Sequence, residues 1–322
     1  MKLALLGAGM IVKEVLPVLQ TIDGIKLLAI LSTPRSLATA QKLASQYGIP
    51  QSSSDYQEIL QNPDVDTVYI GTPNHTHYTY AKQALLADKH VICEKPFTLT
   101  LSELEDLAAI AQERGLFLLE AITNQYLGNF QFLKNNLAKL GDIKIVECNY
   151  SQYSSRYDAF KRGEIAPAFN LDMGGGALRD LNIYNIHLVV GLFGLPQKVQ
   201  YLPNMEKGVD TSGILVMDYG HFKAVCISAK DCSAAIRSTI QGDKGSMAVL
   251  GPTNAMPELT ISLNGQDTQH LNHNRPQHRM YDEFLTFEAM ISERDYAQAQ
   301  VYLEHSLKVM AVLQQASEYL SK

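Results

Sequence analysis

The segment "HVICEKPFTLT" places a lysine where a buried strand is predicted to end. His90–Cys93 is an apolar strand, and it is followed by Glu94, Lys95 and Pro96. A turn has no particular need for an ammonium group, whereas an enzyme can use one to stabilise the oxyanion of a hydroxyl that loses a hydride. The same charge can lower the pKa of a neighbouring acid. The alternative interpretation is a surface ion pair at a turn.

A glycine-containing turn follows the first predicted strand, in "KLALLGAGMIV". Gly7 and Gly9 would allow a tight turn and close approach of the backbone to a pyrophosphate, which the N-terminus of the next helix favours. Val12 stands at the third glycine position of the usual fingerprint, so the motif is incomplete. The residues predicted to form this dinucleotide-binding turn are Gly7, Ala8, Gly9, Met10 and Ile11.

The end of the second predicted strand lacks the acidic residue that would hold the ribose 2′-hydroxyl of NAD. It carries Ser32, Thr33 and Arg35 instead, whose hydroxyl and guanidinium groups could bind the 2′-phosphate of NADP. The alternative is that Arg35 is a solvated charge at a helix start. The sequence therefore favours NADP as the cofactor, with NAD as the second choice.

The motif "GTPNHTH" follows another apolar strand, "VDTVYI". Open α/β sheets bind ligands at the carboxyl ends of their strands, so both this loop and the Glu-Lys pair should border the cofactor. His75 and His77 have no third ligand nearby, and we predict no metal site. The residues expected to face the cofactor here are Thr72, Pro73, Asn74, His77, Glu94 and Lys95.

The elements that position these residues alternate along the first third of the chain. From residue 2 to about 120, continuously apolar segments are separated by amphipathic ones, which predicts a doubly wound parallel sheet of the Rossmann type. Beyond about 121, strand-like segments follow one another without helices between them, which predicts an α+β domain with a large, mainly antiparallel sheet. The predicted domains are 1–120 and 121–322.

Composition narrows the classes of partner. The 322 residues are 46% hydrophobic and 19% charged, with a formal net charge of -6, which argues against nucleic acid and anionic membranes as partners. No apolar run approaches the roughly 20 residues that span a bilayer. The N-terminus reads as a strand rather than a signal peptide, and four dispersed cysteines without CxxC spacing favour reduced thiols. We expect a cytoplasmic protein.

Two longer segments carry a resemblance to a known family. "TPNHTHYTYAKQALLADKHVICEKP" and "GGGALRDLNIYNIHLVVGLFG" (174–194) resemble the two signatures of the Gfo/Idh/MocA family of NAD(P)-dependent oxidoreductases, and "IQGDKGSMAV" is similar to a strand pair of its second domain. The similarity extends over nearly the whole chain. It implies a Rossmann domain, a second domain for substrate binding and oligomerisation into dimers or tetramers, and an active site between the two.

The resemblance also implies the catalytic residues: Lys95, Asp180 and Tyr184. Most members have His at the last position, and the tyrosine is similar to the subgroup of glucose–fructose oxidoreductase and dimeric dihydrodiol dehydrogenase. Asp180, Tyr184 and His187 are spaced i, i+4 and i+7, which predicts one helical face. A tyrosine with a pKa near 10 is a poor base unless a cation such as Lys95 lowers that pKa. The alternative for Tyr184 is packing in the domain interface.

The sequence departs from the family pattern on the substrate side, at Arg179, Asn182 and Gln125. Gln125, Arg156 and His187 are candidate substrate contacts, although Arg156 could be a solvated loop charge and His187 a helix-interior histidine. The predicted reaction is hydride transfer between NADP(H), or NAD(H), and a hydroxyl or carbonyl carbon of a sugar, polyol or cyclic diol. The alternative is a non-catalytic dinucleotide-binding regulator.

Overall fold

The computed structural model describes residues 1–320 and divides into two compact units. Unit 1 comprises Met1–Ala121 and Gln277–Leu307, and unit 2 comprises Ile122–Pro276 and the segment that starts at Lys308. The division predicted near residue 120 lies next to the first of these boundaries and stays a prediction as a domain limit. It does not anticipate the return of Gln277–Leu307 to unit 1.

Unit 1 is built on a six-stranded parallel sheet with the order β3-β2-β1-β4-β5-β6. Because residues Leu3–Leu6 of β1 are fully buried, the sheet is covered on both faces, which explains the continuously apolar strands. This confirms the predicted doubly wound fold. The strands are β1 (Lys2–Leu6), β2 (Lys26–Leu31), β3 (Gln51–Ser53), β4 (Thr67–Ile70), β5 (His90–Glu94) and β6 (Leu118–Ala121).

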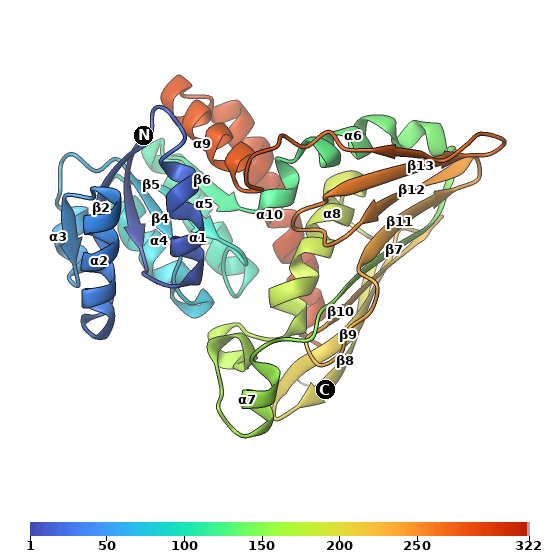
Figure 1. The fold of residues 1–322 in the computed structure, drawn as a ribbon, viewed down its shortest axis with the longest axis horizontal. Coiled ribbons are helices and arrows are strands. Elements are labelled where there is room, and N and C mark those ends of the chain that lie inside the picture. Colours follow the sequence, from blue (N-terminus) through green and yellow to red (C-terminus); the bar gives the residue numbers. More distant parts are fainter. Residues whose placement is uncertain (321–322) are drawn as a thin grey trace. The chain divides into compact units, whose positions relative to one another are not determined.

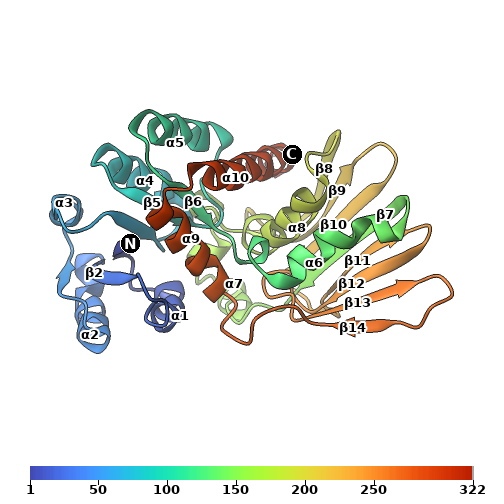
Figure 2. The ribbon, with the colours of Figure 1, turned by 90° about the horizontal axis from the view of Figure 1, so that it is seen from above.

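Helices cover both faces of this sheet, with α1 and α2 on one side and α4 and α5 on the other (Figure 2). Local sequence sets their ends: α5 starts at the capping box of Thr100 and Glu103, and it stops at Gly115 with φ 63°. The helices are α1 (Met10–Leu19), α2 (Leu37–Tyr47), α3 (Tyr56–Leu60), α4 (His77–Leu86), α5 (Leu101–Arg114), α9 (Tyr281–Glu293) and α10 (Tyr296–Ser317), the last of which begins in unit 1.

Aromatic contacts explain why a late segment of the chain belongs to unit 1. Phe284 of α9 is fully buried, and its ring centroid lies 5.5 Å from that of Tyr69 in β4. Tyr296, at the start of α10, stacks on Phe117 at 4.4 Å. Burial of the Phe284 and Phe117 rings contributes about 1.5–3 kcal/mol each. The two residues of each pair are far apart in sequence, so no local sequence pattern predicts these contacts.

Unit 2 contains an eight-stranded sheet with the order β14-β13-β12-β11-β7-β10-β9-β8, which is antiparallel except for the β7–β10 pair. Helices α6 (Gly128–Asn136) and α8 (Ile183–Phe193) lie against one face (Figure 1). The mainly antiparallel sheet confirms the prediction. Its strands are β7 (Ile143–Ser151), β8 (Lys198–Glu206), β9 (Val209–Asp218), β10 (Lys223–Ala229), β11 (Arg237–Gly242), β12 (Gly245–Leu250), β13 (Glu258–Leu263) and β14 (Gln269–Leu271).

Candidate active site

The glycine turn after β1 has the shape that a dinucleotide requires. Gly7 adopts φ +114°, and a Cβ there would lie 2.6 Å from the carbonyl oxygen of Gly71, which follows the neighbouring strand β4. A Cβ added to Gly9, which precedes α1, would meet no atom within 4 Å, and no side chain caps the N-terminus of α1. The strand order reverses between β1 and β4, which is where such sheets bind nucleotides. The turn therefore fits a pyrophosphate.

The residues after β2 are the ones predicted to distinguish the two nicotinamide cofactors. Ser32 is buried and its N–H donates to Ser53 O at 3.0 Å, which fixes the strand end. Thr33 and Arg35 are exposed, and the Thr33 hydroxyl lies 2.9 Å from that of Ser36. Hydroxyls and a guanidinium at this position suit a 2′-phosphate better than an acidic residue would.

The loop after β4 divides into exposed and buried residues. Pro73 is exposed, while Thr72 and Asn74 are half-buried and remain candidates for cofactor contact. His77 is different, because its side chain is fully buried and its Nδ1 and Nε2 lie 2.9 Å from the carbonyl oxygens of Pro96 and Thr72. Both ring nitrogens are therefore occupied, which argues against direct cofactor contact by this side chain.

His77 instead ties the loop after β4 to the loop that carries Lys95. Burial lowers the pKa of His77, and the carbonyl groups of Thr72 and Pro96 oppose that effect, because they favour a protonated ring. Within residues 1–320, no group of three or more His, Cys, Asp or Glu side chains could hold a metal ion.

Lys95 stands directly after the carboxyl end of β5, two strands from the glycine turn after β1. The preceding Glu94 is buried and accepts a hydrogen bond of 2.7 Å from the Tyr69 hydroxyl. Burial raises the pKa of Glu94, while the hydrogen bond from Tyr69 and the charges of Lys95 and Arg279 oppose this rise. Glu94 is therefore anchored in the core of unit 1, and the half-buried Lys95 follows it at the sheet edge.

Asp180 and Tyr184 lie on one helical segment of unit 2. Asp180 belongs to a π-helical turn, Leu178–Asn182, that leads into α8, and its Oδ2 accepts from Lys230 Nζ at 2.8 Å. Tyr184 lies in the first turn of α8 and is 8% exposed, with its ring centroid 6.2 Å from that of Tyr150. The spacing predicted an α-helical face, whereas Asp180 occupies a wider turn of a kind often found at functional sites.

The π-helical turn is held by a buried carboxylate. Asp210 Oδ2 accepts from the Leu178 N–H at 2.7 Å and from the Tyr201 hydroxyl at 2.8 Å. Burial raises the pKa of Asp210, and these two hydrogen bonds oppose the rise. Gly176 has φ +109°, and a Cβ there would collide with Asp210 Oδ1. The glycine-rich segment before the turn thus lets this carboxylate reach the helix start.

Asn182, a departure from the family pattern, anchors α8 to the sheet. Its side chain is fully buried, and Nδ2 donates to Cys226 O in β10 at 3.1 Å. Asn185 donates to Asn182 Oδ1 at 2.9 Å and to Ile227 O at 3.1 Å. This departure therefore serves to pack α8 against the sheet.

Gln125 and His187 are also built into the core of unit 2. Gln125 is 4% exposed, and its Nε2 donates to His187 O and to Asn124 Oδ1, both at 3.0 Å. A Cβ at Gly191 would lie 2.7 Å from Gln125 Oε1, so helix and glutamine are in close contact. The His187 side chain is fully buried. This burial argues against the predicted substrate contacts of Gln125 and His187.

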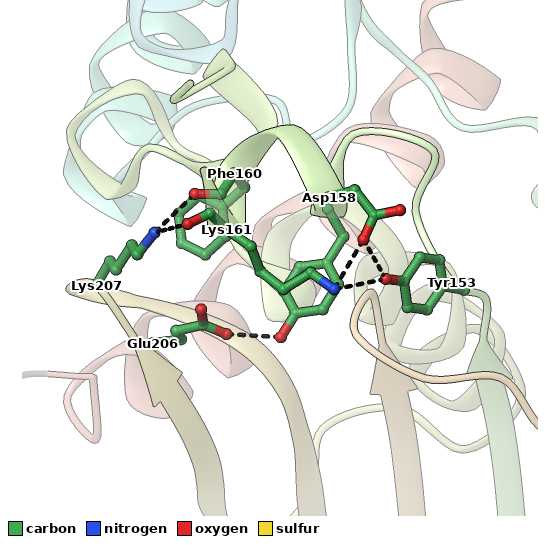
Figure 3. Close-up of polar contacts among 7 residues, drawn as sticks. Tyr153, Asp158, Phe160, Lys161, Glu206 and Lys207 are labelled. Atoms are coloured by element: carbon green, nitrogen blue, oxygen red, sulfur yellow. Dashed lines mark hydrogen bonds and ion pairs between the residues drawn. The ribbon is translucent and has the colours of Figure 1, made fainter. Parts of the chain in front are cut away.

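Arg156 is exposed and precedes a short helix, α7 (Tyr157–Lys161), that the sequence analysis did not predict. Polar contacts hold α7 (Figure 3): Lys161 Nζ lies 2.7 Å from Asp158 Oδ1, and the Tyr157 hydroxyl donates to Glu206 Oε2 at 2.6 Å. The latter bond raises the pKa of Tyr157 to about 12. A substrate role for Arg156 stays a prediction.

Comparison with known proteins identifies the family. Residues 1–121 match the oxidoreductase family with an NAD-binding Rossmann fold, and residues 136–248 match the GFO/IDH/MocA C-terminal domain. The chain is 31% identical over 323 residues to scyllo-inositol 2-dehydrogenase (NADP(+)) IolU of Bacillus subtilis, covering 99% of this chain and 97% of that protein. It is 28% identical over 266 residues to trans-1,2-dihydrobenzene-1,2-diol dehydrogenase of Macaca fuscata fuscata, covering 80% and 76%.

Solved structures share the fold. The 3-ketoreductase KijD10 of Actinomadura kijaniata, in a complex with NADP and TDP-benzene, superposes with a TM-score of 0.85 at 20% identity, covering 99% of this chain and 97% of that one. Together with the glycine turn after β1 and the lysine after β5, these matches confirm the resemblance of the sequence. The chain belongs to the GFO/IDH/MocA family and is an NAD(P)-dependent oxidoreductase.

Proposed function

We propose that this oxidoreductase transfers a hydride between NADP(H) and a hydroxyl or carbonyl carbon of a sugar, polyol or cyclic diol. The observation that carries the proposal is the position of Lys95 at the carboxyl end of β5. The glycine turn after β1 lies at the same end of the parallel sheet. The polyol and diol dehydrogenases among the relatives support the substrate class.

In this proposal, the residues that carry the reaction are Lys95, Asp180 and Tyr184. A bound NADP⁺ would supply the hydride acceptor when the C–H bond of an alcohol breaks. The hydroxyl proton passes to the phenolate form of Tyr184, which becomes a phenol, and Lys95 stabilises the negative charge that develops on the substrate oxygen. Asp180 orients the reacting groups. Reduction of a carbonyl follows the same path in reverse, with Tyr184 as the proton donor.

A substrate panel tests the reaction. The purified protein is mixed with NADPH and a panel of aldoses, ketoses, oxidised inositols and dicarbonyl compounds, and the loss of reduced-cofactor absorbance is followed. The reverse panel contains polyols and cyclic diols with NADP⁺. Saturable turnover of any sugar, polyol or diol supports the proposal. Tight NADPH binding without turnover of any compound would instead favour the non-catalytic regulator.

We further propose that NADP is preferred over NAD. The absence of an acidic residue after β2, the exposed Arg35 and Thr33, and the NADP named for the IolU relative support this preference. A guanidinium that pairs with the 2′-phosphate should act on NADPH alone, because NADH carries a hydroxyl in its place.

Arg35→Ala is expected to weaken NADPH binding about 30-fold and NADH binding less than about 3-fold, since a charge-assisted hydrogen bond contributes roughly 1.5–3 kcal/mol. Titration calorimetry with both cofactors measures the difference. The matched control is Arg114→Ala, which removes an arginine of unit 1 that is ion-paired with Asp88 at 2.6 Å. Equal losses for NADPH and NADH would contradict the preference.

The outer face of the unit 2 sheet is the proposed surface for a homodimer or homotetramer. Leu202 of β8 and Ile214 of β9 are directly paired in register and are 51% and 41% exposed, and Ile145 of β7 is 49% exposed. The buried residues Val146 and Cys148 alternate with the outward ones along β7. Exposed apolar side chains on a sheet face are common in protein interfaces.

Ile214→Lys is expected to convert the oligomer to a monomer, because a lysine directly opposite Leu202 would place a charge in the apolar contact. Sedimentation velocity measures the mass of both proteins. Val301→Lys is the control, because Val301 is 58% exposed on α10 and lies outside this sheet. A wild-type protein that sediments as a monomer would contradict the proposed assembly.

A cytoplasmic location also remains a proposal. All four cysteines lie within residues 1–320 and are free thiols, which is compatible with a reducing compartment. No helix within residues 1–320 combines the length and apolar character needed to cross a membrane.

A further inference from the structure

Lys230 is a buried cation that contacts the proposed catalytic carboxylate. It follows the last residue of β10, and its side chain is only 3% exposed. Its Nζ donates to Asp180 Oδ2 at 2.8 Å and to the carbonyl oxygen of Ala168, and it lies 4.2 Å from the ring centroid of Phe169. We infer that Lys230 is a positioning residue, which fixes the Asp180 carboxylate for the reaction.

The backbone around Lys230 is fixed on both sides. Its N–H donates to Thr211 O in β9 at 2.7 Å, and its carbonyl oxygen accepts from the Ser154 N–H at 2.8 Å. The backbone that carries the ammonium group is therefore held in place at the end of β10. Asp180, by contrast, is 34% exposed and lies in a π-helical turn, so its carboxylate has a buried cation on one side and solvent access on another.

Burying a lysine is costly unless the charge is paired and hydrogen-bonded. The Ala168 carbonyl, the Phe169 ring and the Asp180 carboxylate together replace the lost hydration. Methionine could fill the same space without that cost. The ion pair is therefore better explained by a requirement for an ionised, fixed Asp180 than by packing alone.

Lys207 is an exposed lysine of unit 2 that serves as the control. Its Nζ donates to Phe160 O at 2.9 Å and to Lys161 O at 2.6 Å, and it lies 5.2 Å from the Phe160 ring centroid (Figure 3). The Phe160 and Phe169 rings are stacked at 4.8 Å. Lys207 thus makes the same kinds of carbonyl and aromatic contact as Lys230, but it donates to α7 and not to Asp180.

This inference rests on the proposed function of Asp180, and a double-mutant cycle tests both separately. Steady-state kinetics are measured with NADPH and a substrate that the wild-type protein turns over. The proteins compared are Asp180→Asn, Lys230→Met, the double variant and Lys207→Met. Lys230→Met is expected to lower kcat about 10- to 100-fold, because a displaced carboxylate no longer meets the reacting groups. In the Asp180→Asn background the same change should cost less than about 3-fold. Lys207→Met should change kcat less than about 3-fold.

Two kinetic outcomes overturn different claims. If Asp180→Asn lowers kcat strongly but Lys230→Met does not lower it, or lowers it by the same factor in both backgrounds, the positioning role is wrong and the function of Asp180 survives. If Asp180→Asn turns over like the wild type, the proposed catalytic role of Asp180 is wrong, and the positioning role fails with it.

Thermal unfolding gives a readout that needs no substrate. Asp180→Asn should lower Tm by roughly 5 °C, because it leaves the Lys230 ammonium buried without a carboxylate, and Lys230→Met should restore part of that loss in the double variant. Lys207→Met combined with Asp180→Asn should show additive shifts instead. Additive shifts for Lys230 as well would mean that the two groups are not coupled, and the inference would be overturned.

Discussion

Replacing Lys95 with methionine is expected to lower kcat by about 1000-fold, which is the loss measured when one donor to a developing oxyanion is removed. Methionine keeps the length and apolar stem of the side chain but removes the charge. The Kd for NADPH should change less than about 3-fold, because the proposed contacts of the pyrophosphate and the ribose phosphate are the glycine turn and the residues after β2. Stopped-flow kinetics and calorimetry separate the two quantities.

Lys82→Met is the control for this experiment. Lys82 is another lysine of unit 1, ion-paired with Asp106 at 2.9 Å, and it should be dispensable for turnover. A Lys95→Met protein that keeps more than about a tenth of the wild-type kcat would exclude an essential oxyanion role. A large loss of NADPH affinity with normal kcat would instead make Lys95 a cofactor-binding residue only.

The second large effect is expected for Tyr184→Phe, which removes one hydroxyl and leaves the ring. If Tyr184 exchanges the proton of the substrate hydroxyl, kcat should fall about 100- to 1000-fold, the usual range for loss of a general acid or base. The fold should persist, because the backbone carbonyl of Tyr184 still accepts from Asn124 Nδ2 at 2.9 Å and the ring stays packed. Steady-state kinetics and Tm are measured together.

Tyr150→Phe is the matched control for the tyrosine. Its ring is also buried, and its centroid lies 6.2 Å from that of Tyr184, so both substitutions remove a phenol from the same side of the sheet. Only Tyr184→Phe should lower kcat more than about 3-fold. Wild-type turnover by Tyr184→Phe would show that this ring serves packing, the alternative that the sequence left open.

Much of unit 1 could be predicted from the sequence because its signals are local. Continuously apolar segments specify buried parallel strands, the Thr100–Glu103 capping box starts α5, and Gly115 ends it. The three-residue β3 was missed, since Gln51–Ser53 has no apolar pattern and pairs with β2 through its backbone alone. The family resemblance rests on such contiguous segments, and for that reason it also emerged from the sequence.

The surroundings of the proposed site were decided by contacts between distant residues. The sequence predicted one shared face for Asp180, Tyr184 and His187, but the carboxylate of Asp210 stabilises a π-helical turn at Leu178, and His187 is buried. No local period encodes a hydrogen bond across 32 positions.

For the same reason, the sequence did not indicate a role for Lys230, which appears only as the polar end of the strand "FKAVCISAK". Only the tertiary structure brings its ammonium to Asp180, 50 positions earlier, and shows that it is buried. The sequence by itself thus determined the fold class, the family and the residue types of the site. The tertiary structure decided which of these residues are accessible and which charges hold them, because burial and electrostatic pairing depend on partners that sequence order does not bring together.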